Sequence, residues 1–351
     1  MSTVHDYEKV LDKSDTSVAA FTRERSTLEK IQHFLHSNPA AVPLIVLVIS
    51  VSVFGLILGS KFFNALPLIL QQVAISAIVG AAQTLVILTA GIDLSVGAIM
   101  VLSSVIMGQL AFHGFVIHGV TLLPPLPAPL ALLFGFGVGA LCGWLNGFLI
   151  ARMKLPPFIV TLGTWQIILA SNFLYSANET IRSQDVAAEA PLLQLISGNR
   201  IIIVMFLLVF LLWYVLNHTA WGRYLYAIGD DPDAAELSGV RVKRMLTQVY
   251  VLSGLICALA GWVLIGRLGS VSPTSGQFAN IESITAVVIG GISLFGGRGS
   301  ILGMIFGALI VGVFQLGLRM IGTDPQWTFL LIGVLIIGAV AVDQWIRKVS
   351  G

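Results

Sequence analysis

Residues 200–217 read RIIIVMFLLVFLLWYVLN, and their only charged side chain is that of Arg200 at the start. A helix of this length rises about 27 Å, close to the roughly 30 Å hydrocarbon core of a bilayer. Of the whole chain, 56% is apolar and 10% is charged, whereas soluble domains carry roughly a quarter charged residues. The stretch therefore predicts a membrane-spanning helix, and the composition excludes an ordinary soluble domain.

Similar apolar stretches recur along the chain, separated by short polar or Gly/Pro segments. We expect an all-α polytopic membrane protein with about ten transmembrane helices. One of them, 281–294, is expected to be short or broken, because its length corresponds to a rise of only about 21 Å. The expected spans are 43–59, 66–90, 94–112, 128–151, 157–176, 200–217, 245–266, 281–294, 300–320 and 327–346.

The distribution of Lys and Arg predicts the orientation, because cytoplasmic loops retain positive charge. If the N-terminus is inside, ten crossings place both termini in the cytoplasm. Without the eighth span, Arg347 and Lys348 would fall on the wrong side. With it, only five of the 19 basic residues lie outside: Lys61, Arg182, Arg200, Arg267 and Arg319.

These spans divide the chain into an N-terminal cytoplasmic tail (1–42), a transmembrane domain (43–346) and a short C-terminal cytoplasmic tail (347–351). The longest inner connection is the loop 218–244. We expect no cleavable signal sequence in the first tail, since it lacks an apolar core with a small-residue cleavage site. Within it, 18–37 carries apolar residues at helical spacing beside basic ones, typical of an interfacial helix; a disordered tail is the alternative.

Motifs of enzymes and metal sites are missing from the sequence. The Gly-rich run 296–300 has no following Lys, so it is not a P-loop, and no metalloprotease or serine-hydrolase motif is present. Cys142 and Cys257 both fall inside expected spans, where they read as packing residues. Topology accounts for the basic residues, which argues against nucleic-acid binding. We therefore expect no catalytic residue, metal or cofactor, and any ATP must be handled by another chain.

Glycines repeat every four residues in two expected spans. Such small-residue faces let helices approach closely in membranes, so close packing is the favoured interpretation. Their equivalent places in two five-span halves suggest an internal repeat. Gly91–Gly97 and Gly291–Gly297 also share a Gly-Ile-x-Leu-x-x-Gly pattern, but they do not occupy matching places in the halves, and chance is the alternative in so Gly-rich a chain. The repeated glycines are Gly135, Gly139, Gly143 and Gly147, and Gly299, Gly303 and Gly307.

Polar residues inside the expected spans are candidates for a translocation path. Ionisable groups there are costly and therefore functional candidates, and Asp93 lies between two long apolar runs. It suits capping of the next helix, with a hinge or substrate contact as alternatives. Amides and hydroxyls suit an uncharged hydrophilic solute, although each also suits interhelical hydrogen bonding. The candidates are Gln83, Asp93, Ser95, Asn146, Thr161, Thr164, Trp165, Asn172 and Gln315.

The inner loop 218–244 contains a candidate coupling element. Asp231-Pro232 is a good helix start, and Gly239 can end the helix. Ala234, Ala235 and Leu237 give it a small apolar face. We expect a short helix that projects from the inner surface.

The segment Asp233-Ala234-Ala235-x-x-x-Gly239 resembles the Glu-Ala-Ala-x-x-x-Gly motif of permease subunits of ABC importers. The later Ile-x-Leu-Pro part is absent, which points away from the maltose-type branch. Four further stretches are similar to ribose/xylose-type monosaccharide permeases, and the resemblance covers the chain from residue 43 onward. They are Gly91–Gly97, Asn146-Gly147 with Pro157–Thr164, Gly222–Gly239 and Val288–Gly303.

The resemblance implies a channel-forming subunit in a bacterial inner membrane that moves a monosaccharide inward by alternating access. The implied partners are two cytoplasmic ATPase subunits, an extracytoplasmic sugar-binding protein and a second permease copy or a close relative. Gln315-Leu316-Gly317 departs from the Asn-Gly that is common in the family, so the sugar stays open. The residues implied to couple to the ATPase are Gly222, Arg223, Asp233, Ala234, Ala235 and Gly239.

Two other functions stay open on the sequence alone. An ion- or proton-coupled secondary transporter is supported by Asp93 and the suggested repeat. An ABC permease for another small polar solute, such as a branched-chain amino acid or a nucleoside, would keep the same architecture.

Overall fold

The computed structural model describes residues 38, 40–117, 120–276 and 278–347. The candidate interfacial helix within 18–37 therefore lies outside the described residues. Residues 39–343 form one compact unit, to which the following description applies. Of the other unit, the structure describes Asn38 and the last turn of the final helix, 344–347.

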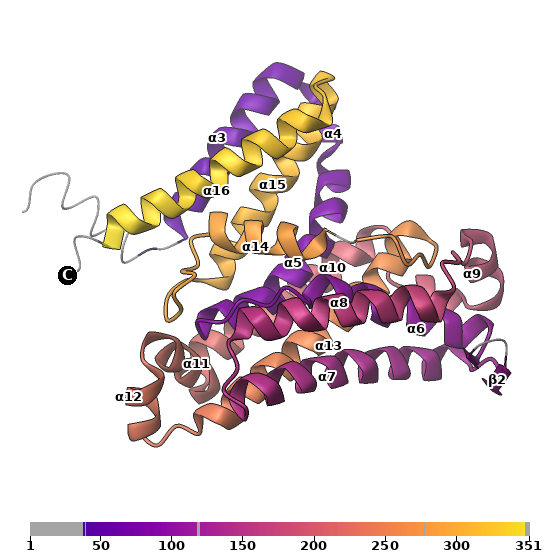
Figure 1. Ribbon diagram of the computed structural model, residues 1–351. Helices are drawn as coiled ribbons and strands as arrows, with labels where there is room; N and C mark the ends of the chain where they lie inside the picture. Colours follow the sequence, from indigo (N-terminus) through magenta and orange to yellow (C-terminus); the bar gives the residue numbers. More distant parts are fainter. Residues whose placement is uncertain (1–37, 39, 118–119, 277, 348–351) are drawn as a thin grey trace, which may run out of the picture. The chain divides into compact units, whose positions relative to one another are not determined.

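Ten long or apolar helices coincide with the ten expected spans, within a few residues at each end (Figure 1). They are α3 (Ala41–Leu58), α5 (Leu66–Leu88), α6 (Val96–Phe112), α7 (Ala128–Ala151), α8 (Pro157–Ser176), α10 (Asn199–His218), α13 (Val242–Leu268), α14 (Ala279–Ile289), α15 (Ile301–Ile321) and α16 (Pro325–Arg347). Five short elements connect them: α4 (Ser60–Asn64), α9 (Ser183–Glu189), the 3-10 helix η1 (Pro191–Gln194), α11 (Ala220–Asp230) and α12 (Pro232–Leu237).

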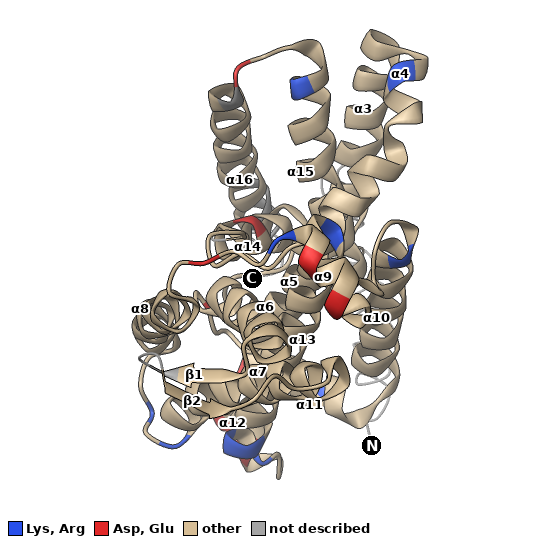
Figure 2. Ribbon diagram, turned by 90° about the vertical axis from the view of Figure 1, so that its right-hand side faces the viewer, with Lys and Arg blue, Asp and Glu red and all other residues tan. Residues whose placement is uncertain are grey.

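Among the described residues, seven helices are long and apolar enough to cross a membrane, and three shorter apolar helices accompany them. Most charged residues lie in loops, short helices and helix ends, and the long helices are nearly free of charge (Figure 2). A polytopic helical membrane protein is thereby confirmed. Ten full crossings stay a prediction, because α6, α14 and the apolar part of α16, Gln326–Ala341, are each shorter than the seven long helices.

The connection between α6 and α7 corrects the all-helical expectation. Strands β1 (Phe115–Ile117) and β2 (Val120–Leu123) form an antiparallel hairpin after α6. Both strands are rich in β-branched and aromatic residues, which favour extended backbone, and Gly114 enters the first strand with a φ of 74°. The two strands are only three and four residues long, so the helical pattern of the rest of the chain gave no reason to expect them.

Helix α14 is short, as predicted, with 11 residues that rise about 17 Å. It ends where Gly291 adopts a φ of 75°, and it packs against α15 and α5. Added methyl groups at Gly303 and Gly307 of α15 would collide with the backbone at Gly290 and Ala286. These two glycines therefore let α15 lie directly on α14, whereas Gly299 precedes the helix.

Helix α13 is the centre of the bundle, since it packs against α7, α6 and α5. Gly139, Gly143 and Gly147 of α7 face it at close range, whereas Gly135 faces α6. A methyl group at Gly139 would lie 2.5 Å from the carbonyl oxygen of Gly254, and one at Gly143 would collide with the backbone of Tyr250. The predicted close-packing role of this glycine stripe is confirmed.

Two loops that contain the repeated Gly-Ile-x-Leu pattern share a turn geometry. The Asp93 carboxylate accepts from the Ser95 backbone N–H at 2.8 Å, and the Ser293 hydroxyl accepts from the Phe295 N–H at 3.1 Å. Each loop follows a helix and leads into the next one. The two loops do not occupy matching places in two five-span halves, so this likeness is local and the internal repeat stays a prediction.

Candidate functional site

The loop 218–244, expected on the inner side, folds into two short helices, α11 and α12. At the start of α12, the Asp231 carboxylate accepts from the backbone N–H groups of Asp233 and Ala234, at 2.9 and 3.0 Å. Pro232 occupies the first turn, where a backbone N–H would have no partner within the helix, so the missing N–H of proline costs no hydrogen bond. Gly239 follows the helix with a φ of 87°, a conformation that favours glycine. The predicted short helix is confirmed, with the predicted start and end.

Helix α12 is anchored by one face and exposed on the other. Ala235 is buried in a cluster with Ile228, Val240, Val242 and Met245. In contrast, Asp233 and Ala234 are exposed, and Leu237 is 90% exposed. The largely exposed Leu237 beside small side chains forms an apolar knob on this face.

Helix α11 connects this knob to two loops of the bundle. A methyl group at Gly229 would collide with the Leu88 carbonyl and the Gly297 N–H, and these two groups are bonded to one another at 3.0 Å. The Tyr226 hydroxyl donates to the Gly299 carbonyl at 3.0 Å, and burial raises the pKa of Tyr226 to about 12. Helix α11 therefore touches both the end of α5 and the loop before α15.

Of the remaining residues expected to couple to an ATPase, Gly222 is buried against the Leu216 backbone and Arg223 is exposed. Sequence reasoning missed Tyr226, Gly229 and Gly297. Tyr226 and Gly229 lie inside the resembling segment, but only folding shows what they touch.

A buried polar cluster surrounds Asp93. Its carboxylate accepts from the Ser95 hydroxyl at 2.6 Å, and the Asn146 amide donates to that same hydroxyl at 2.8 Å. The Gln83 amide, oriented to satisfy both partners, bonds the backbone C=O and N–H of Asp93 at 2.9 and 3.2 Å. The Thr161 hydroxyl donates to the Ile92 carbonyl at 3.0 Å.

This cluster joins α5, α7 and α8 to the loop before α6. Asp93 caps the turn at Ser95 rather than the first turn of α6 itself. All of its hydrogen-bonding side chains are essentially buried, so their clearest role is to hold the loop in place. Among the path candidates elsewhere, Asn172 bonds the Pro273 carbonyl, Thr164 bonds the Thr161 carbonyl, and Trp165 packs on the core.

A polar cavity of about 270 Å³ lies between α5, α13, α14 and α15. The Gln72 amide donates to the Gln315 side chain at 3.1 Å. Glu282 interacts with Gln315 and, electrostatically, with Arg267. A carboxylate and a guanidinium that face a cavity within apolar helices mark a functional site by default. The polar lining is Gln72, Ser76, Arg267, Ser275, Glu282 and Gln315.

Of the predicted path residues, only Gln315 lines this cavity. Glu282 and Gln72 are polar residues in expected spans, but nothing in the sequence near either residue indicates that it contacts Gln315. Arg267 was expected in an outer connection. Its position at the end of α13 brings it beside Glu282, which lies 15 residues further along the chain.

Comparisons with known proteins agree with this architecture. Residues 65–340 match the family described as branched-chain amino acid transport system / permease component. A fructose import permease protein from Rhizobium meliloti is 70% identical over 98% of this chain and 96% of its own length. No solved structure matches.

More distant relatives have other sugars in their names. A ribose import permease protein from Bacillus subtilis is 36% identical over 92% of this chain and 98% of its own length. A galactose/methyl galactoside import permease protein from Haemophilus influenzae is 31% identical over 91% and 98%. The chain belongs to this family of membrane permease components, and its role is transport rather than catalysis.

Proposed function

We propose that the chain forms the translocation channel of an ATP-driven importer for a monosaccharide, with fructose as the first candidate. The observation that carries this proposal is the 70% identity, over nearly the full length of both chains, to a fructose import permease protein. The ribose and galactose relatives support the broader class.

The cavity at Gln72 and Gln315 is proposed as a sugar contact. Drug-sized ligands occupy pockets of about 300–1,000 Å³, so a cavity of about 270 Å³ suits a smaller solute. Sugar hydroxyls both donate and accept hydrogen bonds, and the amides, the Glu282 carboxylate and the Arg267 guanidinium offer both kinds of partner.

Transport is proposed to follow alternating access. Closure of two ATPase subunits on ATP would press on the exposed face of α12, and α11 would carry the displacement to the loops at Leu88 and Gly297. The resembling residues Gly222, Arg223, Asp233, Ala234, Ala235 and Gly239 form this coupling element. A sugar-binding protein outside and a second permease, identical or closely related, complete the assembly.

In the membrane, we propose ten crossings with both termini in the cytoplasm. Seven long helices and three shorter apolar ones supply the segments. This orientation puts α11 and α12 on the inner side, where an ATPase would meet them, and it puts the cavity nearer the outer side, because Arg267 lies in the last turn of α13.

The test is uptake of labelled fructose in cells that express the complete transport system and lack their own fructose uptake. Saturable uptake that persists with an uncoupler supports the ATP-driven importer, whereas loss of uptake with intact ATP levels supports secondary transport. Competition with unlabelled ribose, galactose and fructose ranks the sugars, and no fructose uptake would overturn the substrate.

The cavity can be tested separately with adjacent glutamines of α5. Gln72→Leu removes a cavity amide, and we expect roughly ten-fold weaker uptake at low sugar, as for one lost hydrogen bond. Gln71→Leu is the matched control, since Gln71 bonds Asn199 and does not line the cavity. Equal uptake by both variants would remove the cavity from the sugar path.

A branched-chain amino acid is the second candidate substrate. The family description names it, and the opposite charges of Arg267 and Glu282 could pair with an amino acid's carboxylate and ammonium groups. Competition by leucine, but not by fructose, would favour it.

A further inference from the structure

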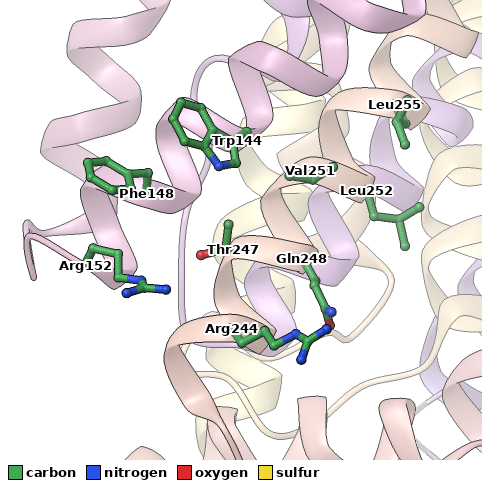
Figure 3. Close-up of a pocket in the computed structure, with 9 residues that line it drawn as sticks. All are labelled: Trp144, Phe148, Arg152, Arg244, Thr247, Gln248, Val251, Leu252 and Leu255. Atoms are coloured by element: carbon green, nitrogen blue, oxygen red, sulfur yellow. The ribbon is translucent and has the colours of Figure 1, made fainter.

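A second pocket, of about 540 Å³, lies between α7 and α13 (Figure 3). It shares no lining residue with the cavity at Gln72 and Gln315. Its walls are mainly apolar, and it has no carboxylate in its lining. Figure 3 shows Arg152 and Arg244 toward one end and Trp144 and Leu255 toward the other. The lining is Trp144, Phe148, Arg152, Arg244, Thr247, Gln248, Val251, Leu252 and Leu255.

Helical spacing makes this pocket an elongated groove. Trp144, Phe148 and Arg152 follow one another at intervals of four along one face of α7 and its end. The distance from Trp144 to Arg152 is about 12 Å along the axis, and that from Arg244 to Leu255 is about 16 Å. The rings of Trp144 and Phe148 are stacked, with centroids 5.5 Å apart, and form a flat apolar wall.

The charged end of the groove is available to an anion. Neither the Arg152 nor the Arg244 guanidinium has a hydrogen bond or ion pair with any residue that the structure describes. Both side chains are exposed, as are those of Trp144 and Phe148. A groove with two cations at one end and an apolar length does not match a sugar, whose polar groups surround the whole molecule.

The charged end lies on the same side of the bundle as the coupling element. Arg244 follows Val242 in the first turn of α13, and Val242 packs in the cluster that anchors Ala235 of α12. In the proposed orientation this is the cytoplasmic side, so the apolar length of the groove lies in the inner leaflet. Basic pockets between helices on the cytoplasmic side are typical sites for anionic lipid head groups.

We propose that this groove binds an anionic phospholipid of the inner leaflet. Its phosphate lies between Arg152 and Arg244, and an acyl chain follows the wall of Trp144, Phe148 and Leu252. The inner-leaflet placement rests on the proposed orientation, but not on the identity of the transported solute. A helix from a second copy could also cover the groove, but its apolar surface would offer no negative charge to Arg152 and Arg244. An anionic lipid offers that charge, and we therefore propose the lipid as the occupant.

The test measures lipid binding by the purified full-length chain. Phosphatidylglycerol and phosphatidylcholine are titrated separately, and bound lipid is counted by native mass spectrometry. We expect the wild-type chain to prefer phosphatidylglycerol and Arg152→Gln or Arg244→Gln to weaken its binding roughly five-fold each. Lys154→Gln is the matched control, a nearby cation outside the groove, and it should leave the affinity unchanged.

A second variant keeps both charges. Leu252→Trp fills the apolar length, and we expect it to weaken phosphatidylglycerol binding while the chain stays folded and monodisperse. A photoreactive phosphatidylglycerol should label peptides of α7 and α13 in the wild type and lose this labelling in the double arginine variant.

Two outcomes would overturn the proposal. One is phosphatidylglycerol binding that is equal in the wild type and in the double arginine variant. The other is disulfide cross-linking of Trp144→Cys between two copies in the membrane, which would show that a second chain covers the groove.

Discussion

The contact between α7 and α13 makes a sharp prediction about Gly139. A methyl group at this position would lie 2.5 Å from the Gly254 carbonyl oxygen and 2.8 Å from the Ala258 Cβ. Carbon–oxygen contacts between packed helices are normally about 3.3–3.6 Å. Gly139→Ala should therefore force the two helices apart by about 1 Å.

The expected cost follows from two opposing effects. Overpacking of a close interface costs about 1–3 kcal/mol, whereas Ala in place of Gly stabilises a helix by about 0.5–1 kcal/mol. Gly137→Ala on the same helix is the control, because nothing lies within 4 Å of its added methyl group. The control receives only the favourable effect, so the two variants should differ by roughly 1–3 kcal/mol in unfolding free energy.

The assay is equilibrium unfolding of the purified chain in mixed micelles with increasing denaturing detergent, followed by circular dichroism. Gly139→Ala should unfold earlier than the wild type, and Gly137→Ala at the same point or later. Equal unfolding free energies for the two variants would refute close packing of α7 on α13 as the reason for the glycine stripe.

Three other perturbations have defined outcomes. Gly229→Ala should lower coupled uptake roughly ten-fold at unchanged membrane level, because its methyl group displaces α11 from Leu88 and Gly297; normal uptake would contradict the coupling route. Asn146→Leu should lower the free energy of unfolding by about 1–3 kcal/mol, because the buried Ser95 hydroxyl loses the hydrogen bond that the Asn146 amide donates. Asn217→Leu, which removes an exposed amide, is the control, and an equal effect of the two substitutions would contradict the prediction. For Tyr226, whose folded pKa is raised to about 12 from 10.0, the neutral hydroxyl stabilises the fold below pH 10 and this contribution is lost as pH rises through 12. Unfolding titrations should show a smaller loss in Tyr226→Phe than in the wild type, and an equal loss in both would contradict the prediction.

Much of the fold could be predicted because the hydropathy of each apolar stretch indicates a helix without reference to the rest of the chain. The stretch 200–217 predicted a helix that the structure places at Asn199–His218. Asp231, Pro232 and Gly239 predicted the limits of α12, since caps and turn residues act on the backbone nearest to them. The glycine stripe predicted a packing face, although not which helix would occupy it.

The candidate sites were less accessible, because they depend on pairs that are distant in sequence. Gln72 and Gln315 are 243 residues apart and form one hydrogen bond. Two of the four amides predicted to line a path, Gln83 and Asn146, are buried and hold the loop at Asp93. Composition cannot distinguish these two uses of an amide, because both require the same side chain in an apolar helix.

The sequence by itself determined that this chain is a helical membrane protein, where its long or apolar helices lie and where the short helix α12 begins and ends. Those properties follow from hydropathy and from hydrogen bonds within a segment, which need no partner elsewhere in the chain. Only the tertiary structure decided that Glu282 meets Arg267 at a polar cavity and that Arg152 and Arg244 close one end of an apolar groove. Each of these sites depends on the rotation and crossing of packed helices, which are set by side-chain contacts between segments.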